Sequence, residues 1–208
     1  NWDFRGIDTL SWMPAAVPGT VHTDLFANGI IGDPFKDNNE IKQQWIENEN
    51  WEYLTVFSVD KEQFDKKHHE LNFKGLDTYA DVYLNDSLIL EANNMFRSWR
   101  VDVTGLLNEE GNVLNIVFTS PIIKNDSIAR SYLKLPAGGD TSEFPVGPFT
   151  RKAAYHFGWD FAPRFVTSGI WQDIVLESWD GFILRDVYYQ TEDISPETAL
   201  IYLDYKFE

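Results

Sequence analysis

The sequence predicts an all-β fold, a sandwich or a barrel, from three observations. Most segments alternate apolar and polar residues with the period of two that is typical of half-buried strands. These segments are short, rich in Val, Tyr, Phe and Trp, and bounded by Gly, Asn and Asp. Helical patterns are present, but none is long enough to organise a domain.

The predicted strands fall into two groups along the chain. The first group occupies the region before residue 120: Trp51–Asp60, His69–Lys74, Tyr79–Asn85, Met95–Val103 and Asn112–Thr119. The second group lies near the end of the chain: Trp171–Glu177, Phe182–Gln190 and Ala199–Phe207. Many short strands separated by turn residues indicate a sandwich or barrel rather than a βαβ fold.

Two short helices and two long loops interrupt the strands. Thr20 is a suitable cap for a helix over Val21–Asn28. A second helix is predicted to open at Ser120-Pro121, because proline fits the first helical turn. Long loops in compact domains are often functional, and two are predicted here, Asp33–Asn50 and Leu135–Pro148.

The composition shifts around Ser178–Gly181, which predicts a first domain over residues 1–178 and a second segment over 179–208. The second segment holds only two predicted strands, and two strands do not form a stable sheet alone. It is therefore interpreted as the truncated start of another β domain. The chain opens at Asn1 without Met, so we expect a trimmed first strand in the first domain.

Composition argues against several classes of partner. The net charge is −16, which repels phosphate backbones and excludes a nucleic-acid partner. No stretch has the length of a membrane span, and the absence of Cys removes disulfides and thiolate metal sites. Aromatic residues make up 15% of the chain and include eight Trp. Packing accounts for most of them, but sugar sites also use flat aromatic faces.

A series of motifs then carries a family resemblance. In order, they are Trp12–Leu25 (WMPAAVPGTVHTDL), Asp33-Pro34-Phe35, Asn39-Glu40, Gln44-Trp45, Phe73–Asn85, Asn94–Arg97, Arg151–Ala153, Phe157–Arg164, Thr167 and Gly169–Trp171. This order resembles the N-terminal domain of β-mannosidases in glycoside hydrolase family 2, from Trp12 to about Asp180.

The resemblance implies a jelly-roll, galactose-binding-like sandwich, followed by an immunoglobulin-like domain to which residues 179–208 would belong. A (β/α)8 barrel would follow and supply both catalytic glutamates of a retaining exo-β-mannosidase. That enzyme removes terminal β-D-mannose from β-D-mannosides. The present chain would then be inactive alone, and neither Glu40 nor Glu47 is a catalytic residue. No cofactor and no metal site are implied.

The resemblance also implies a sugar contact at the segment Gly158–Arg164, which matches the part of the family that helps to close the non-reducing-end subsite. Asp160 would accept hydrogen bonds from sugar hydroxyls, and its charge strengthens them. Trp159 would form an apolar wall, and Arg164 would hold the Asp160 carboxylate without touching the sugar. The alternative is a buried Asp–Arg pair that anchors a corner, with Trp159 in the core.

The sequence departs from the family at Phe161 and Ala162, where Trp and Gly are usual, so the exact sugar preference is left open. Asn39 and Glu40 are weaker candidates for a sugar contact, because both are also ordinary loop residues.

The expected partners are β-mannosides or related oligosaccharides, together with the barrel of the same enzyme. Three alternatives stay open: a self-sufficient carbohydrate-binding module, a purely structural domain, and a sister activity such as β-galactosidase, β-glucuronidase or exo-β-glucosaminidase. The expected location is the bacterial periplasm or another exported compartment, or the lysosome in a eukaryote.

Overall fold

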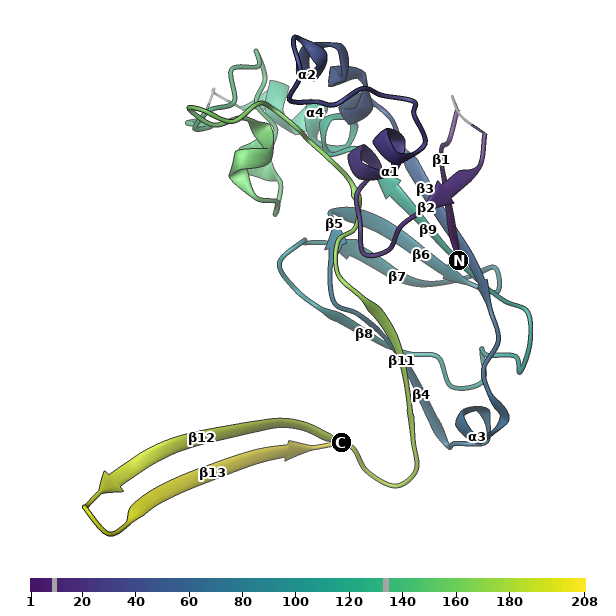
Figure 1. Cartoon of the computed structure of the whole chain (residues 1–208), viewed down its shortest axis with the longest axis vertical. Helices are drawn as coiled ribbons and strands as arrows, with labels where there is room; N and C mark the ends of the chain where they lie inside the picture. Colours follow the sequence, from purple (N-terminus) through teal and green to yellow (C-terminus); the bar gives the residue numbers. More distant parts are fainter. Residues whose placement is uncertain (9–10, 133–134) are drawn as a thin grey trace.

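The computed structural model describes residues 1–8, 11–132 and 135–208 and confirms an all-β sandwich with short helices (Figure 1). Its larger layer is a six-stranded antiparallel sheet. In spatial order, its strands are β2 (Met13–Ala15), β1 (Trp2–Gly6), β3 (Trp51–Phe57), β9 (Asn112–Thr119), β6 (Tyr79–Leu84) and β7 (Ser87–Asn93). Strands β3 and β9 alternate buried and less buried residues, which is the pattern that the sequence predicts.

The second layer contains a three-stranded sheet and a short two-stranded one. The three-stranded sheet has the order β11 (Ile174–Trp179), β4 (His68–Phe73) and β8 (Trp99–Asp102), and the short sheet pairs β5 (Leu76–Asp77) with β10 (Gly169–Ile170). One core cluster joins the layers and includes Tyr53 and Phe118 from the larger sheet and Phe73 from the smaller. Burying such a ring contributes about 1.5–3 kcal/mol.

Most of the helices gather at one end of the sandwich, which is also the end where the candidate site lies (Figure 1). They are α1 (Val21–Ala27), α2 (Asn39–Lys42), η1 (Gln44–Asn48), α4 (Pro121–Ser131), η2 (Gly147–Phe149) and η3 (Ala154–Phe157), and α3 (Lys61–Phe64) lies at the opposite end. Thr20 caps α1 as predicted, in a capping box with Thr23, and Ser120 caps α4. None of the helices in the described residues is both long and apolar enough to cross a membrane.

Several predicted bounds were wrong. The strand predicted over Trp51–Asp60 ends at Phe57, because Asp60 accepts a hydrogen bond from Gln63 N and caps α3. The predicted loop Asp33–Asn50 contains α2 and η1. The strand predicted over Met95–Val103 begins only at Trp99, and the one predicted over Trp171–Glu177 runs from Ile174 to Trp179.

The last two strands, β12 (Leu184–Ile194) and β13 (Ala199–Phe207), form an antiparallel hairpin that extends away from the sandwich (Figure 1). Arg185 links its base to the smaller sheet. The guanidinium donates to Glu70 at 2.8 and 2.9 Å, to Glu177 at 3.3 Å and to Glu208 at 2.8 Å. The hairpin is therefore tied to the sandwich by one buried cation rather than by a shared core.

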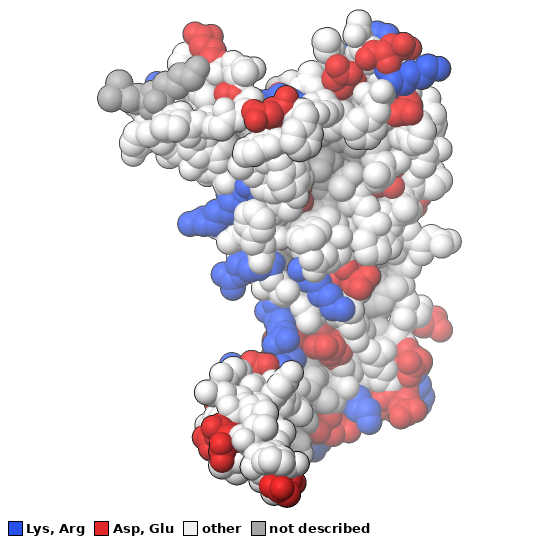
Figure 2. All heavy atoms as spheres, turned by 60° about the vertical axis from the view of Figure 1, so that its left-hand side comes forward, with Lys and Arg blue, Asp and Glu red and all other residues white. Residues whose placement is uncertain are grey.

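Charge is unevenly placed on the face that Figure 2 shows. Lysine and arginine side chains gather between the helical end and the hairpin, whereas Asp and Glu are spread over both ends. On this face the negative charge is thus distributed rather than gathered in one acidic patch.

Candidate functional site

The segment that follows η3 forms a tight turn at the helical end. Trp159 N donates to Ala162 O at 3.2 Å and Ala162 N donates to Trp159 O at 3.3 Å, which places Asp160 and Phe161 at the tip. Gly158 precedes the turn with φ of 109°, a conformation that glycine adopts without strain. The local backbone therefore presents Asp160 and Phe161 to solvent.

Aromatic side chains and a free carboxylate meet at this turn. Trp159 is 50% exposed and Phe161 is 89% exposed. Together with Ala154, Tyr155 and Ala162 they line a cavity of about 490 Å³. Within the described part of the chain, Asp160 is exposed and makes no hydrogen bond or ion pair, so its oxygens are available to a ligand. The alternative that Trp159 is a core residue does not fit its exposure.

Arg164 does not pair with Asp160, which corrects the sequence-based expectation. Its guanidinium donates to Glu47 at 2.8 and 3.2 Å and to Asp140 at 2.8 Å. A further bond reaches Phe157 O at 3.2 Å. The alternative, a buried pair between Asp160 and Arg164, is absent as well, because the buried acid that Arg164 contacts is Asp140. Arg164 therefore anchors the turn to Glu47 and Asp140 instead of holding the Asp160 carboxylate.

Two further contacts fix the turn. A Cβ on Gly139 would lie 2.4 Å from Gly158 O, so the loop after α4 touches the backbone of the turn. On the other side, Gln44 Nε2 donates to Arg164 O at 2.9 Å. The turn is thus held between η1 and the Gly139 loop.

Asn39 and Glu40 lie on α2 and line neither of the two cavities at this end. Asn39 Nδ2 donates to Asp33 O at 2.9 Å, and Glu40 O accepts from Gln44 Nε2 at 2.8 Å. In the structure both residues organise their own segment.

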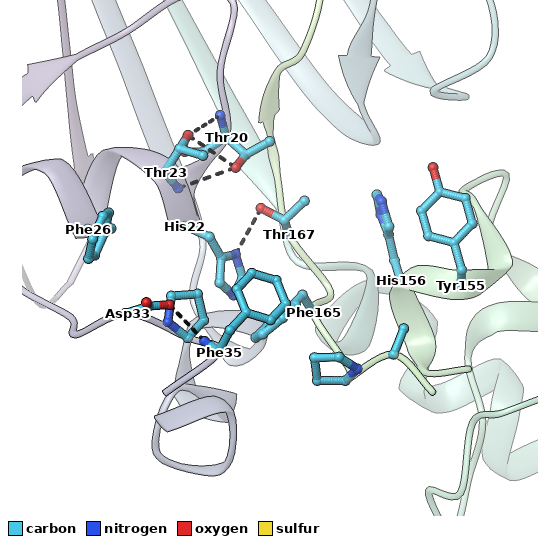
Figure 3. A pocket seen from close by; sticks show the side chains of 13 residues that line it. Thr20, His22, Thr23, Phe26, Asp33, Phe35, Tyr155, His156, Phe165 and Thr167 are labelled. Atoms are coloured by element: carbon cyan, nitrogen blue, oxygen red, sulfur yellow. Dashed lines mark hydrogen bonds between the residues drawn. The ribbon is translucent and has the colours of Figure 1, made fainter. Parts of the chain in front are cut away.

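A second cavity, of about 570 Å³, opens beside the first and shares Tyr155 and Ala162 with it. His22 from α1 and His156 from η3 line it (Figure 3), and His22 Nδ1 lies 2.9 Å from Thr167 Oγ1. Its remaining walls are mainly apolar and aromatic. His22, His156 and Thr167 belong to or adjoin motifs of the sequence, but these motifs are far apart along the chain and their spacing does not predict that the side chains lie together.

A buried ion pair lies next to the second cavity. Lys152 Nζ donates to Asp77 and, at 2.8 Å, to Thr167 O, and burial lowers the pKa of Lys152. Burial, followed by the charge of Lys152, lowers the pKa of His22 and of His156 to about 4. Both imidazoles are therefore neutral at pH 7. Sequence analysis missed this cluster, because Lys152 and Asp77 belong to motifs without a distinctive pattern.

The described ranges hold no group of three or more His, Cys, Asp or Glu side chains that is placed to bind a metal ion. The side chains that line the two cavities offer aromatic rings for stacking, and neutral imidazoles and hydroxyls for hydrogen bonding, and the Asp160 carboxylate is exposed beside them.

Comparisons with known proteins assign this chain to a family. Residues 2–172 match the model described as glycosyl hydrolase 2 galactose-binding domain-like. β-Mannosidase B from Thermothelomyces thermophilus is 38% identical over 197 residues, which are 92% of this chain and 22% of that protein. β-Mannosidase B from Aspergillus terreus is 36% identical over 200 residues, 92% of this chain and 23% of that protein.

Among solved structures, the β-D-mannosidase from Dictyoglomus thermophilum matches with a TM-score of 0.91 and 39% identity, over 100% of this chain and 25% of that one. An exo-chitosanase from Amycolatopsis orientalis matches with a TM-score of 0.67 and 19% identity, over 92% of this chain and 21% of that one, which shows a shared fold alone. The chain thus spans about a quarter of the length of the proteins that it matches.

Proposed function

Because the chain belongs to the glycosyl hydrolase 2 galactose-binding domain-like family, we propose that it is the substrate-flanking domain of a retaining exo-β-mannosidase. The observation that carries the proposal is the match to a β-D-mannosidase, with 39% identity and a TM-score of 0.91 over the whole chain. The exo-chitosanase reaches only 19% identity, which favours β-mannosidase over that sister activity.

In this proposal the chain contributes recognition and the remainder of the enzyme contributes bond cleavage. Both catalytic glutamates lie outside these residues, so the chain alone has no hydrolytic activity. The exposed turn at Asp160 supports the role of this chain in recognition, because an aromatic wall beside an unpaired carboxylate suits a pyranose ring. Asp160 accepts hydrogen bonds from two hydroxyls of the non-reducing-end mannose, and Trp159 packs against the ring.

In this proposal Arg164 does not contact the sugar. Its hydrogen bonds to Glu47 and Asp140 fix the position of the turn, so its role is to position Asp160. Asn39 and Glu40 stay the weaker candidates, because both lie on α2 and neither lines a cavity at this end.

The hairpin fits the start of an immunoglobulin-like domain over residues 179–208, after a first domain over 1–178. Residues that pair directly across β12 and β13 share a face. One face is almost wholly apolar, and its members are Leu184, Val187, Tyr189, Thr191, Ile194, Ala199, Ile201, Leu203, Tyr205 and Phe207. The other carries most of the charge, with Asp186, Asp193, Asp204 and Lys206. An exposed sheet with one apolar face is suited to the inner layer of a second sandwich.

The test is the steady-state kinetics of the complete enzyme on a short β-mannoside with Asp160→Asn. Losing charged hydrogen bonds of about 1.5–3 kcal/mol predicts a fall of about 10- to 100-fold in kcat/KM. Asp3→Asn is the matched control, because Asp3 is also an exposed acid and lies on β1. An unchanged kcat/KM for Asp160→Asn would contradict the assignment.

A self-sufficient carbohydrate-binding module is the second candidate, favoured by the cavity of about 490 Å³ that this chain forms alone. Calorimetric titration of the chain with mannose separates the two. Saturable binding that Asp160→Asn abolishes would favour the module, whereas the substrate-flanking domain is expected to bind weakly without the other half of the site.

A further inference from the structure

Two asparagines of the chain stand in the pattern Asn-X-Ser that N-linked glycosylation requires. The first triplet is Asn85-Asp86-Ser87, in the turn between β6 and β7, and the second is Asn125-Asp126-Ser127, within α4. A pattern this short occurs in many proteins and does not by itself show that a glycan is attached. The contacts of the two amide nitrogens decide whether the folded chain has room for one.

N-linked glycosylation changes the hydrogen-bonding capacity of an asparagine side chain. The amide nitrogen, Nδ2, forms a bond to C1 of a sugar carried on a lipid diphosphate, one amide proton is lost, and the lipid diphosphate leaves. An unmodified asparagine donates two hydrogen bonds through Nδ2. The product keeps a single N–H and carries a sugar in place of the other. An asparagine whose two N–H groups both serve the fold therefore cannot carry a glycan in the folded state.

Asn125 uses both of its N–H groups inside the protein. The residue is 8% exposed, and Nδ2 donates to Tyr79 OH at 2.9 Å and to Thr150 Oγ1 at 2.8 Å. The two hydroxyls donate in turn to Phe149 O at 3.3 Å and to Val146 O at 2.9 Å. Since each hydroxyl has only one hydrogen, both accept from Asn125, and the amide nitrogen rather than the oxygen must face them.

The hydrogen bonds of Asn125 join three parts of the helical end. Asn125 lies on α4, Tyr79 is the first residue of β6, and Thr150 directly follows η2. A sugar on Nδ2 would displace one of the two hydroxyls and leave its oxygen without a donor, which is unfavourable for a buried group. Glycosylation of Asn125 would therefore separate elements that pack together in the fold.

Asn85 is held by three hydrogen bonds, although it lies in a turn. Its φ of 48° places it in the left-handed region, which asparagine tolerates better than most residues. Nδ2 donates to Leu106 O at 2.8 Å and to Asn112 Oδ1 at 3.1 Å, and Oδ1 accepts from Val113 N at 2.9 Å. Both N–H groups are again in use, and the side chain fixes the β6–β7 turn to the start of β9.

We infer that an N-linked glycan on Asn85 or Asn125 and the folded sandwich exclude each other, so that the chain reaches its fold where these asparagines are not glycosylated. The inference goes beyond the proposed function and does not depend on it, because it rests on contacts within this chain alone. Among the expected locations, the lysosome of a eukaryote is reached through the compartment where such triplets are glycosylated. The inference therefore argues against that location.

Secretion of the complete enzyme from a eukaryotic host that attaches N-linked glycans tests the inference. We expect peptide mass spectrometry of the secreted, folded protein to find Asn85 and Asn125 unmodified. Glu110→Thr provides the positive control, because it creates the same pattern at Asn108. Asn108 is exposed, and its side chain makes no hydrogen bond within the described part of the chain, so a glycan is expected there in the folded protein.

A second measurement tests the role of the N–H groups without glycosylation. Asn125→Leu, made in a bacterial cytosol, keeps a side chain of similar size and removes both donors. It should lower the thermal midpoint of the complete enzyme, because two buried hydroxyl oxygens lose their donor. Asn108→Leu is the matched control and should leave the midpoint unchanged, since its side chain makes no hydrogen bond within the described residues.

Two results would overturn the inference. The first is a glycan on Asn85 or Asn125 in secreted protein whose thermal midpoint equals that of the unglycosylated protein from bacteria. The second is an equal midpoint for Asn125→Leu and Asn108→Leu, which would show that the fold does not need the N–H groups of Asn125. Neither measurement uses cleavage of β-mannosides, so failure of the proposed function would leave both results interpretable.

Discussion

Replacing Arg164 by Ala should destabilise the helical end and move the turn at Asp160. The substitution removes four hydrogen bonds at once, and it leaves the Asp140 carboxylate, whose side chain is 0% exposed, without its cation. Removing one partner of a buried ion pair costs about 3–5 kcal/mol. Two features reduce this cost. Ser142 still donates to Asp140 through its N and Oγ at 3.0 and 2.6 Å, and the Arg164 side chain is 21% exposed.

We therefore expect a loss of about 2–3 kcal/mol in the free energy of unfolding, measured by urea titration with fluorescence detection. Arg164→Lys keeps the charge but not the fork that spans Glu47 and Asp140, so its loss should be intermediate. Adding Asp140→Asn to Arg164→Ala should recover part of the stability. A loss below about 0.5 kcal/mol for Arg164→Ala would show that its pairing with Glu47 and Asp140 is only a surface contact.

Three further outcomes are expected. Because the folded pKa values of His22 and His156 lie near 4, the unfolded chain binds more protons between pH 4 and about 6.5. The free energy of unfolding should therefore fall as pH drops through that window, and replacing His156 with Asn should flatten the profile. Lys152→Met should cost about 3–5 kcal/mol in denaturant titration, since it strands Asp77, and Asp77→Asn in the same chain should restore part of it. Arg185→Ala should raise amide hydrogen exchange in the hairpin while exchange in the six-stranded sheet stays unchanged.

The sequence was sufficient for the central strands, because their residues alternate strictly between a core and a less buried side, as in β9 with its pattern from Asn112 to Thr119. It missed β1, β2, β7 and the two-residue strands β5 and β10. Strand β2 is only three residues long and contains Pro14, and β7 lies at the sheet edge with a register shift between Val82 and Tyr83 of its partner. Such strands can be identified from the strands that they pair with in the structure, but not from their own sequence pattern.

The candidate site was predictable only in part. The turn itself lies within one continuous motif, so its residues could be named from the sequence. The partners of Arg164 could not, because Glu47 lies 117 residues away and the chain offers many equivalent acids. The meeting of His22 with Thr167 across 145 residues is likewise a product of the tertiary fold.

If the turn at Asp160 contacts the sugar, as we propose, the contact between Gly139 and Gly158 has a consequence for sugar preference. Since main chain meets main chain there, with no side chain between, the Gly139 loop limits how far the turn at Asp160 can move. Any side chain at position 139 would push the turn outward, whichever residues occupy its tip. Inserting or deleting residues between 141 and 146 would shift that loop and so re-aim Asp160. Altered specificity should therefore be reached more readily by varying the length of this loop than by exchanging Trp159.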